Sequence, residues 1–199
     1  QETETFNTQS AIYWNGPDGY STERCTRVST MGAEGVTAGD LDGDGKPVVV
    51  FCNTMTGHAK TSPTLPSYIY FGGPDADYGV HRRQELPVGG ECSACAVIDL
   101  DLDGWNDLVF GSTEGLRIFQ GGSDGFHPDR YEDLPCFMPG VQVADFNGDG
   151  YLDILALSHT YNDKPETFAN SSRIFWGSSE GFNPDRFDIF PTFTGSHAY

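Results

Sequence analysis

The chain has 199 residues, and its 29 acidic residues against 11 lysines and arginines give a formal net charge of −18. This acidic balance excludes nucleic acid and anionic membrane surfaces as expected partners. A content of 37% hydrophobic and 13% aromatic residues excludes a disordered tail, and no apolar run is long enough for a membrane-inserted helix.

Short runs of β-branched and aromatic residues, bounded by Gly, Pro, Asp and Ser, predict strands and turns along the whole chain. In chain order, the expected strands are 11–14 and 22–28, then 36–39, 47–53, 68–72 and 80–86, then 95–98, 107–111, 116–120 and 128–133, and last 141–144, 153–158, 172–176 and 185–189. Helical periodicity is hard to find.

Two repeated units alternate along the chain. One joins aromatic residues, glycine and arginine, as in RIFQGGSDGFHPDR from Arg117 and RIFWGSSEGFNPDR from Arg173, with related copies from Ile12 and Ile69. The other is acidic and reads AGDLDGDG from Ala38, VIDLDLDG from Val97 and VADFNGDG from Val143. The repeated aromatics are expected to pack one repeat against the next: Trp14, Phe71, Phe119 and Phe175. The repeated arginines are expected to connect strand ends to carbonyls or acids: Arg24, Arg82, Arg130 and Arg186.

A period of roughly 45–60 residues with four short strands is typical of a propeller blade. The sequence therefore predicts an all-β fold, a β-propeller of four-stranded antiparallel blades with about three and a half blades present. The expected division is 1–30 for the last two strands of a blade, 31–90, 91–136 and 137–194 for whole blades, and 195–199 for the start of the next. A fragment of a longer chain is favoured over a ring completed by further chains or a filament.

The acidic unit places oxygen atoms at alternate positions of a tight loop. In the loop from Asp99, carboxylates stand at positions 1, 3, 5 and 9, a glycine at position 6 permits the turn, and position 7 offers its carbonyl. Such a cage suits Ca²⁺, which takes about 6–8 oxygen ligands. An EF-hand would need Glu at position 12, where Phe51, Phe110 and Ala156 stand. Val48 at position 9 of the first loop predicts weaker binding there, so two to three ions are expected.

These motifs resemble FG-GAP/VCBS-type repeats, because DLDGDG, DLDLDGWND and DFNGDGYLD alternate with YFGG, FQGG and FWGS. The resemblance implies a seven-bladed, calcium-binding propeller like that of integrin α subunits and of bacterial secreted and surface proteins. It implies one calcium loop between the first two strands of a blade. The implied metal ligands are Asp40, Asp42, Asp44 and Lys46, then Asp99, Asp101, Asp103, Trp105 and Asp107, and then Asp145, Asn147, Asp149, Tyr151 and Asp153.

The favoured function is an extracellular or cell-surface, non-catalytic adhesion module that binds a glycan or protein ligand on a propeller face. The long connections 54–67 and 159–171 are the candidate binding loops. One alternative is a structural subunit of a cell-surface or filamentous assembly, and the other is part of a polysaccharide-degrading enzyme. Catalysis is not expected, because the conspicuous carboxylates are expected to serve as ion ligands and no HExxH motif is present.

The five cysteines are an odd set that permits up to two disulfides: Cys25, Cys52, Cys92, Cys95 and Cys136. Redox and zinc roles for the Cys92-x-x-Cys95 pair are disfavoured, because no second such pair and no βαβ pattern accompany it. Structural or disulfide roles are expected, with the pairing open. Asn170-Ser-Ser172 is a glycosylation sequon in a secretory setting.

Overall fold

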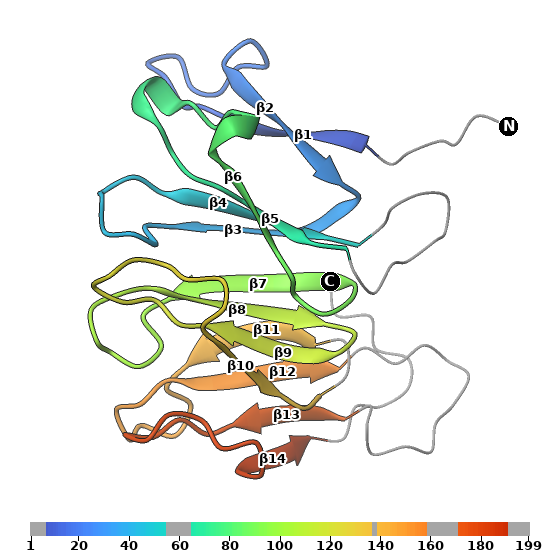
Figure 1. The fold of residues 1–199 in the computed structure, drawn as a ribbon, viewed down its shortest axis with the longest axis vertical. Coiled ribbons are helices and arrows are strands. Elements are labelled where there is room, and N and C mark those ends of the chain that lie inside the picture. The colour runs from blue at the N-terminus through green and yellow to red at the C-terminus, as the bar shows by residue number, and fades with distance from the viewer. Residues whose placement is uncertain (1–6, 55–64, 137–138, 159–170, 191–199) are drawn as a thin grey trace, which may run out of the picture.

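The computed structural model describes residues 7–54, 65–136, 139–158 and 171–190 (Figure 1). These residues form one two-stranded and three four-stranded sheets, and every paired neighbour is antiparallel. The all-β prediction is confirmed. The described residues contain no helix long and apolar enough to cross a membrane.

Each sheet is a simple meander in which strands that follow each other in sequence also pair in space. The two-stranded sheet holds β1 (Asn7–Tyr13) and β2 (Cys25–Met31). The four-stranded sheets hold β3 (Ala33–Gly39), β4 (Val48–Asn53), β5 (Ser67–Tyr70) and β6 (Arg83–Leu86); β7 (Cys92–Ile98), β8 (Asp107–Ser112), β9 (Gly115–Phe119) and β10 (Tyr131–Leu134); and β11 (Pro139–Ala144), β12 (Asp153–Ser158), β13 (Ser172–Phe175) and β14 (Phe187–Phe190). Two 3₁₀ helices, η1 (Pro74–Ala76) and η2 (Val80–Arg82), lie between β5 and β6.

All predicted strands exist, but the last strand of each four-stranded sheet begins later than predicted. The expected strand 80–86 opens with η2, and the expected strand 128–133 begins only at Tyr131. In the second case a tight turn at residues 127–130 precedes the strand, because the Arg130 N–H donates to the His127 carbonyl at 3.1 Å. The boundaries assigned to the blades remain predictions, and residues 195–199 lie outside the described part.

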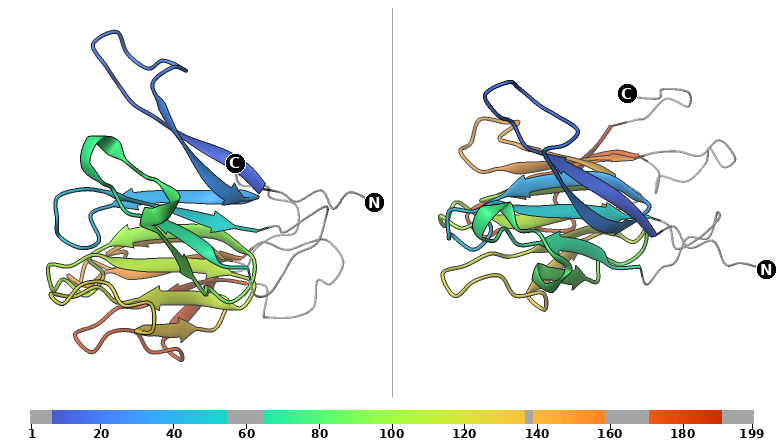
Figure 2. Two further views of the ribbon diagram at one scale, coloured as in Figure 1. Left: turned by 45° about the horizontal axis from the view of Figure 1, so that its top comes forward. Right: turned by 90° about the horizontal axis from the view of Figure 1, so that it is seen from above.

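Neighbouring sheets pack against each other, with their first strands β3, β7 and β11 side by side (Figures 1 and 2). In β4, Val48, Val50 and Cys52 join a hydrophobic cluster shared with the β7–β10 sheet, while Val49 and Phe51 join one shared with β1–β2. A strand covered on both faces needs apolar residues on both, so the PVVVF run is continuous where a half-exposed strand would alternate. This is the arrangement of successive propeller blades.

Two of the four repeated aromatics, Phe119 and Phe175, pack as predicted, whereas Trp14 and Phe71 each lie one residue beyond the end of their strand. Phe119 and Phe175 are 0% exposed, and both end the third strand of their sheets. In the first sheet Tyr70 holds that place and is 1% exposed, whereas Phe71, singled out from the sequence, lies one residue beyond and is half-buried.

The repeated arginines mark a recurring backbone contact. The residue after each aromatic strand end donates its N–H to an arginine carbonyl, as Gln120 does to Arg130 at 3.2 Å and Phe71 to Arg82 at 3.0 Å. The Arg82 guanidinium in turn donates to the Phe71 and Gly72 carbonyls at 3.1 and 3.0 Å. These contacts support the expected structural role.

Candidate calcium loops

The three acidic loops occupy equivalent places in the fold. Each joins the first two strands of a four-stranded sheet: residues 40–47 join β3 to β4, 99–106 join β7 to β8, and 145–152 join β11 to β12. All three lie at the same edge of the stacked sheets, on the left in Figure 1. The chain therefore presents its densest group of carboxylates on one side.

The loops share a set of hydrogen bonds from their own backbone. The carboxylate at position 1 accepts the N–H of position 6 at 2.9 Å in every loop, with Asp40, Asp99 and Asp145 as acceptors. The carboxylate at position 5 accepts the N–H of position 7, at 2.8 Å for Asp44 and Asp103 and 2.9 Å for Asp149. These bonds hold the side chains inward and order the loop around a point.

The second loop has the geometry of a cation site. One carboxylate oxygen from each of Asp99, Asp101 and Asp107 lies within 4.8 Å of the others. The Asp99 Oδ1 atom is buried and has no hydrogen-bond partner in the structure. An oxygen in that condition is costly unless something pairs with it, and a hard cation is the partner that three gathered carboxylates favour. Asp103 lies outside this closest group.

The carboxylate at position 9 is both a candidate ligand and a structural tie. Asp107 Oδ2 accepts the Leu100 N–H at 2.8 Å, and Oδ1 accepts the Gly121 N–H at 2.7 Å. Burial raises the pKa of Asp107 to about 6; the two N–H groups act against this, and the charges of Asp101 and Asp103 add to it. A cation placed among these carboxylates would favour the ionised form.

The third loop repeats the tie but gathers fewer charges. Asp153 is 0% exposed, and its oxygens accept the N–H groups of Phe146 and Gly177, both at 2.9 Å. Asn147 replaces a carboxylate at position 3, and its amide donates to Asp149 at 3.0 Å. The carboxylates of this loop do not form one of the closely gathered groups seen among the described residues.

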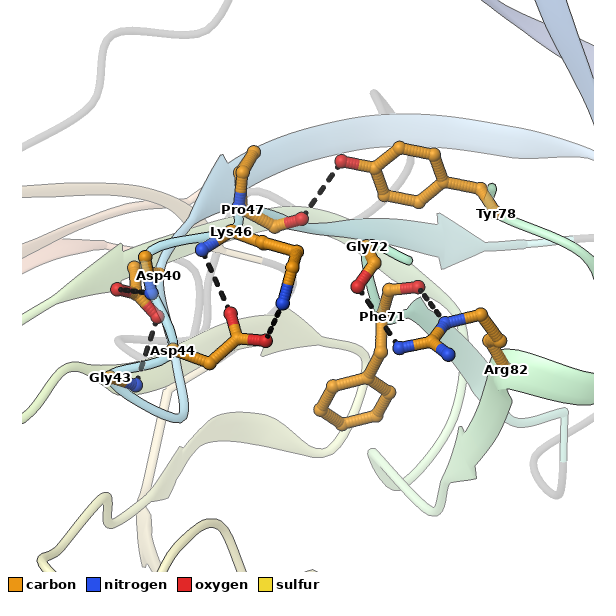
Figure 3. Close-up of polar contacts among 10 residues, drawn as sticks. Asp40, Gly43, Asp44, Lys46, Pro47, Phe71, Gly72, Tyr78 and Arg82 are labelled. Atoms are coloured by element: carbon orange, nitrogen blue, oxygen red, sulfur yellow. Dashed lines mark hydrogen bonds and ion pairs between the residues drawn. The ribbon is translucent and has the colours of Figure 1, made fainter. Parts of the chain in front are cut away.

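The first loop departs from the pattern in two ways, and Figure 3 shows the first of them, the contact of Lys46 with Asp44. Asp40, Asp42 and Asp44 gather within 4.8 Å, but the Lys46 ammonium pairs with Asp44 and lowers the pKa of its carboxyl. Val48 replaces the carboxylate at position 9 and is 1% exposed, so it belongs to the core. These two features support the expectation of a weaker ion site.

The first and second loops touch. The Asn106 amide donates to the Asp40 carbonyl at 2.6 Å, which links the eighth position of one loop to the first position of the other. The Trp105 ring lies over Gly43, where an added Cβ would be 2.6 Å from the ring. Neither contact was predicted from the sequence, because each depends on how two sheets pack.

The sequence marks Gly72, Gly121 and Gly177 as repeated glycines just after each aromatic strand, but their contact with the acidic loops was not predicted. At all three the nearest atom to an added Cβ belongs to the position-8 residue of the acidic loop: the carbonyl oxygens of Pro47, Asn106 and Leu152. A side chain has no room there. The repeated glycine was the signal that the hairpin of the aromatic unit rests on the acidic loop.

One residue of the second loop is strained. Leu102 has φ of +63° and is 56% exposed, whereas the first and third loops place Gly43 and Gly148 at the same position, with φ of +70° and +77°. A left-handed backbone costs a residue with a Cβ about 1–2 kcal/mol, and glycine avoids this cost.

We expect Leu102→Gly to stabilise the protein by about 0.5–1 kcal/mol, because the relieved strain exceeds the added entropy of glycine in the unfolded chain. The measurement is urea unfolding at fixed calcium. Leu102→Ala is the matched control, since alanine removes the exposed side chain but keeps the strained backbone. Equal stability of the two variants would refute the strain argument.

A cleft of about 400 Å³ adjoins the second loop, between the β7–β10 and β11–β14 sheets. Its walls carry the carboxyl groups of Asp101, Asp103, Asp107, Glu132 and Glu180. Burial, and then the Asp107 charge, raises the pKa of Glu132. The long connections expected to bind a ligand fall mostly on residues 55–64 and 159–170, outside the described part, as does Asn170.

Comparison with known proteins agrees with this geometry. Residues 99–156, which include the second and third acidic loops, match the family model of the FG-GAP-like repeat. The chain is 33% identical to integrin alpha-6 of Homo sapiens over 104 residues, which cover 44% of this chain. The matched stretch is 9% of the length of integrin alpha-6.

Proposed function

Because the chain is an FG-GAP repeat protein, we propose that it is a calcium-dependent, non-catalytic adhesion module that works outside the cell and binds a protein ligand. Two to three calcium ions would occupy the acidic loops, the second and third more tightly than the first. The chain's likeness to integrin alpha-6 supports the extracellular setting and the protein ligand.

The geometry of the second acidic loop is the observation that supports calcium binding. Three of its carboxylates converge within 4.8 Å, and one buried oxygen of Asp99 has no partner. Like charges this close repel each other unless a cation lies between them. Calcium suits the site better than magnesium, because the loop offers many protein oxygens and magnesium retains most of its waters.

The ions would act on binding by fixing the loop edge of the sheets. The loops rest on the aromatic–glycine hairpins through Asp107 and Gly121, and on each other through Asn106 and Asp40. A rigid edge presents its side chains to a partner without an ordering cost. The acidic cleft beside the second loop offers a place for a lysine or arginine of that partner.

The test is binding of the full-length protein to a panel of immobilised extracellular-matrix proteins and to a glycan array, in 1 mM calcium (about the level of extracellular sites) and in excess EGTA. We expect binding to at least one matrix protein, weakened at least about tenfold by EGTA, which is about 1.4 kcal/mol. The variant Asp99→Asn with Asp101→Asn should bind weakly in both solutions.

Glu85→Gln is the matched control, because Glu85 lies in β6, away from the loops, and pairs with Arg83 at the surface. It should behave as the wild type. Binding that is confined to glycans, or that ignores both EGTA and the loop substitutions, would contradict the proposal. A stable polymer in a solution mass measurement would favour the assembly role instead.

A further inference from the structure

Three of the five cysteines meet between the first two four-stranded sheets. Cys52 lies in β4, and Cys92 and Cys95 lie in β7. Cys52 and Cys92 are both 0% exposed and belong to one hydrophobic cluster, against which Cys95 also packs. Residues far apart in the sequence therefore bring three thiols to a single inter-sheet contact.

The backbone around Cys52 places its sulfur at the start of β7. Cys52 is the partner of Gly35 in the register of β3 and β4. An added Cβ at Gly35 would be 3.2 Å from the Cys52 Sγ atom and 2.6 Å from the Ser93 carbonyl oxygen. The missing side chain of Gly35 leaves room for this sulfur beside the residue that follows Cys92.

The three thiols also interact. Burial first, and then the hydrogen-bonding Cys92 and Cys95 thiols, raise the pKa of Cys52 well above its usual value. A protonated, buried thiol is a poor nucleophile. The cluster is therefore unsuited to thiol chemistry in the folded protein, and any oxidation would accompany folding.

The two cysteines of β7 are badly placed to pair with each other. Three residues of strand, at about 3.3 Å each, separate their Cα atoms by roughly 10 Å, while a disulfide needs less than about 7 Å. A register shift between Cys92 and Ala94 turns both cysteines toward Cys52, where a regular pleat would turn only one. Each of them therefore faces Cys52 as a partner across the sheets.

A metal role for the thiols is not supported. The closely gathered groups of candidate metal ligands in the described part consist of carboxylates and contain no cysteine. Cys92 is preferred over Cys95 as the partner of Cys52, because Cys92 is as deeply buried as Cys52 and lies next to Ser93.

We propose that Cys52 and Cys92 form a disulfide that joins β4 to β7 and so links two neighbouring blades, while Cys95 stays a thiol. The oxidant is a disulfide of an oxidising secretory compartment. The two thiols lose two protons and two electrons as their S–S bond forms, and the S–S bond of the oxidant breaks to give two thiols. An extracellular protein passes through such a compartment.

The test is peptide mapping of the full-length protein secreted from a eukaryotic host, with free thiols blocked by iodoacetamide under denaturing conditions. Trypsin cleaves after Arg83, between the two proposed partners. We expect an unreduced peptide pair that joins Cys52 to Cys92, with the iodoacetamide label on Cys95. A label on Cys52, or a Cys52–Cys95 link, would overturn the proposal.

A second measurement does not depend on peptide recovery. Dithiothreitol should lower the melting temperature of the wild type by about 5–10 °C, since opening the link frees a long loop of the unfolded chain. Most of that shift should vanish in Cys52→Ala and in Cys92→Ala. Cys25→Ala, which lies outside the cluster, should keep it, and a full shift in Cys52→Ala would also overturn the link.

Discussion

Removal of calcium should lower the melting temperature of the full-length protein by about 5–10 °C. Each ion at about ten times its dissociation constant, the ratio that 1 mM calcium gives at an extracellular site, stabilises the folded state by about 1.4 kcal/mol, and two such loops double this. The physical reason is the repulsion among carboxylates that the fold holds together, as at Asp99, Asp101 and Asp107. The measurement is a thermal melt in 1 mM calcium and in EGTA, with calcium restored in a third sample.

Two controls make this result specific. Magnesium at the same concentration should recover little of the shift, because the loops offer more protein oxygens than magnesium accepts. The double variant Asp99→Asn with Asp145→Asn should lose most of the difference between calcium and EGTA, because only the weaker first loop is left intact. If EGTA leaves the wild-type melting temperature unchanged, the acidic loops are ion-free turns and the proposed function loses its basis.

Asp153→Ala should cost about 3 kcal/mol of folding free energy even without calcium. The side chain is 0% exposed, and its two oxygens accept the N–H groups of Phe146 and Gly177, which would lose their partner. Hydrogen bonds to a charged group are worth about 1.5–3 kcal/mol each. Urea unfolding in EGTA measures this loss free of any contribution from an ion.

Asp149→Ala is the comparison that separates the two roles of these carboxylates. Asp149 is an expected ligand that is exposed, and among the described residues its carboxylate accepts from the Asn147 amide and the Tyr151 N–H of the same loop. Its loss should weaken calcium binding but change the stability in EGTA by less than about 0.5 kcal/mol. Equal losses for the two variants in EGTA would show that Asp153 is not a structural tie.

Much of this fold follows from sequence patterns that are local. The apolar run of β4 predicts a strand covered on both faces, and residues 153–158 were predicted with the bounds that β12 has. The acidic loops could be predicted because their spacing repeats and because side-chain oxygens at alternate positions of a tight loop indicate a cation site. Local hydrogen bonds in the loops, such as the one that the Trp105 N–H donates to the Asp103 carboxylate, then orient the side chains as the spacing implies.

What the sequence did not reveal depends on contacts between distant residues. Asp107 accepts from Gly121, 14 residues away, and Asn106 donates to Asp40, 66 residues away. Neither contact can be inferred from residue type or spacing, because each depends on how the strands and sheets pack. The same holds for Cys52, whose neighbours lie on another sheet. The strand end was also misplaced by one residue in the copy from Ile69, because Tyr70 and not Phe71 ends β5.

The burial of β4 on both of its faces affects how the protein unfolds. A blade that opened alone would expose Val50 on one face and Phe51 on the other, so water would wet two apolar surfaces at once. Partial opening is therefore disfavoured for an inner blade, and slow hydrogen exchange should extend evenly over β4 and β8. Unfolding or proteolysis would then begin at a blade with one uncovered face and advance inward one blade at a time.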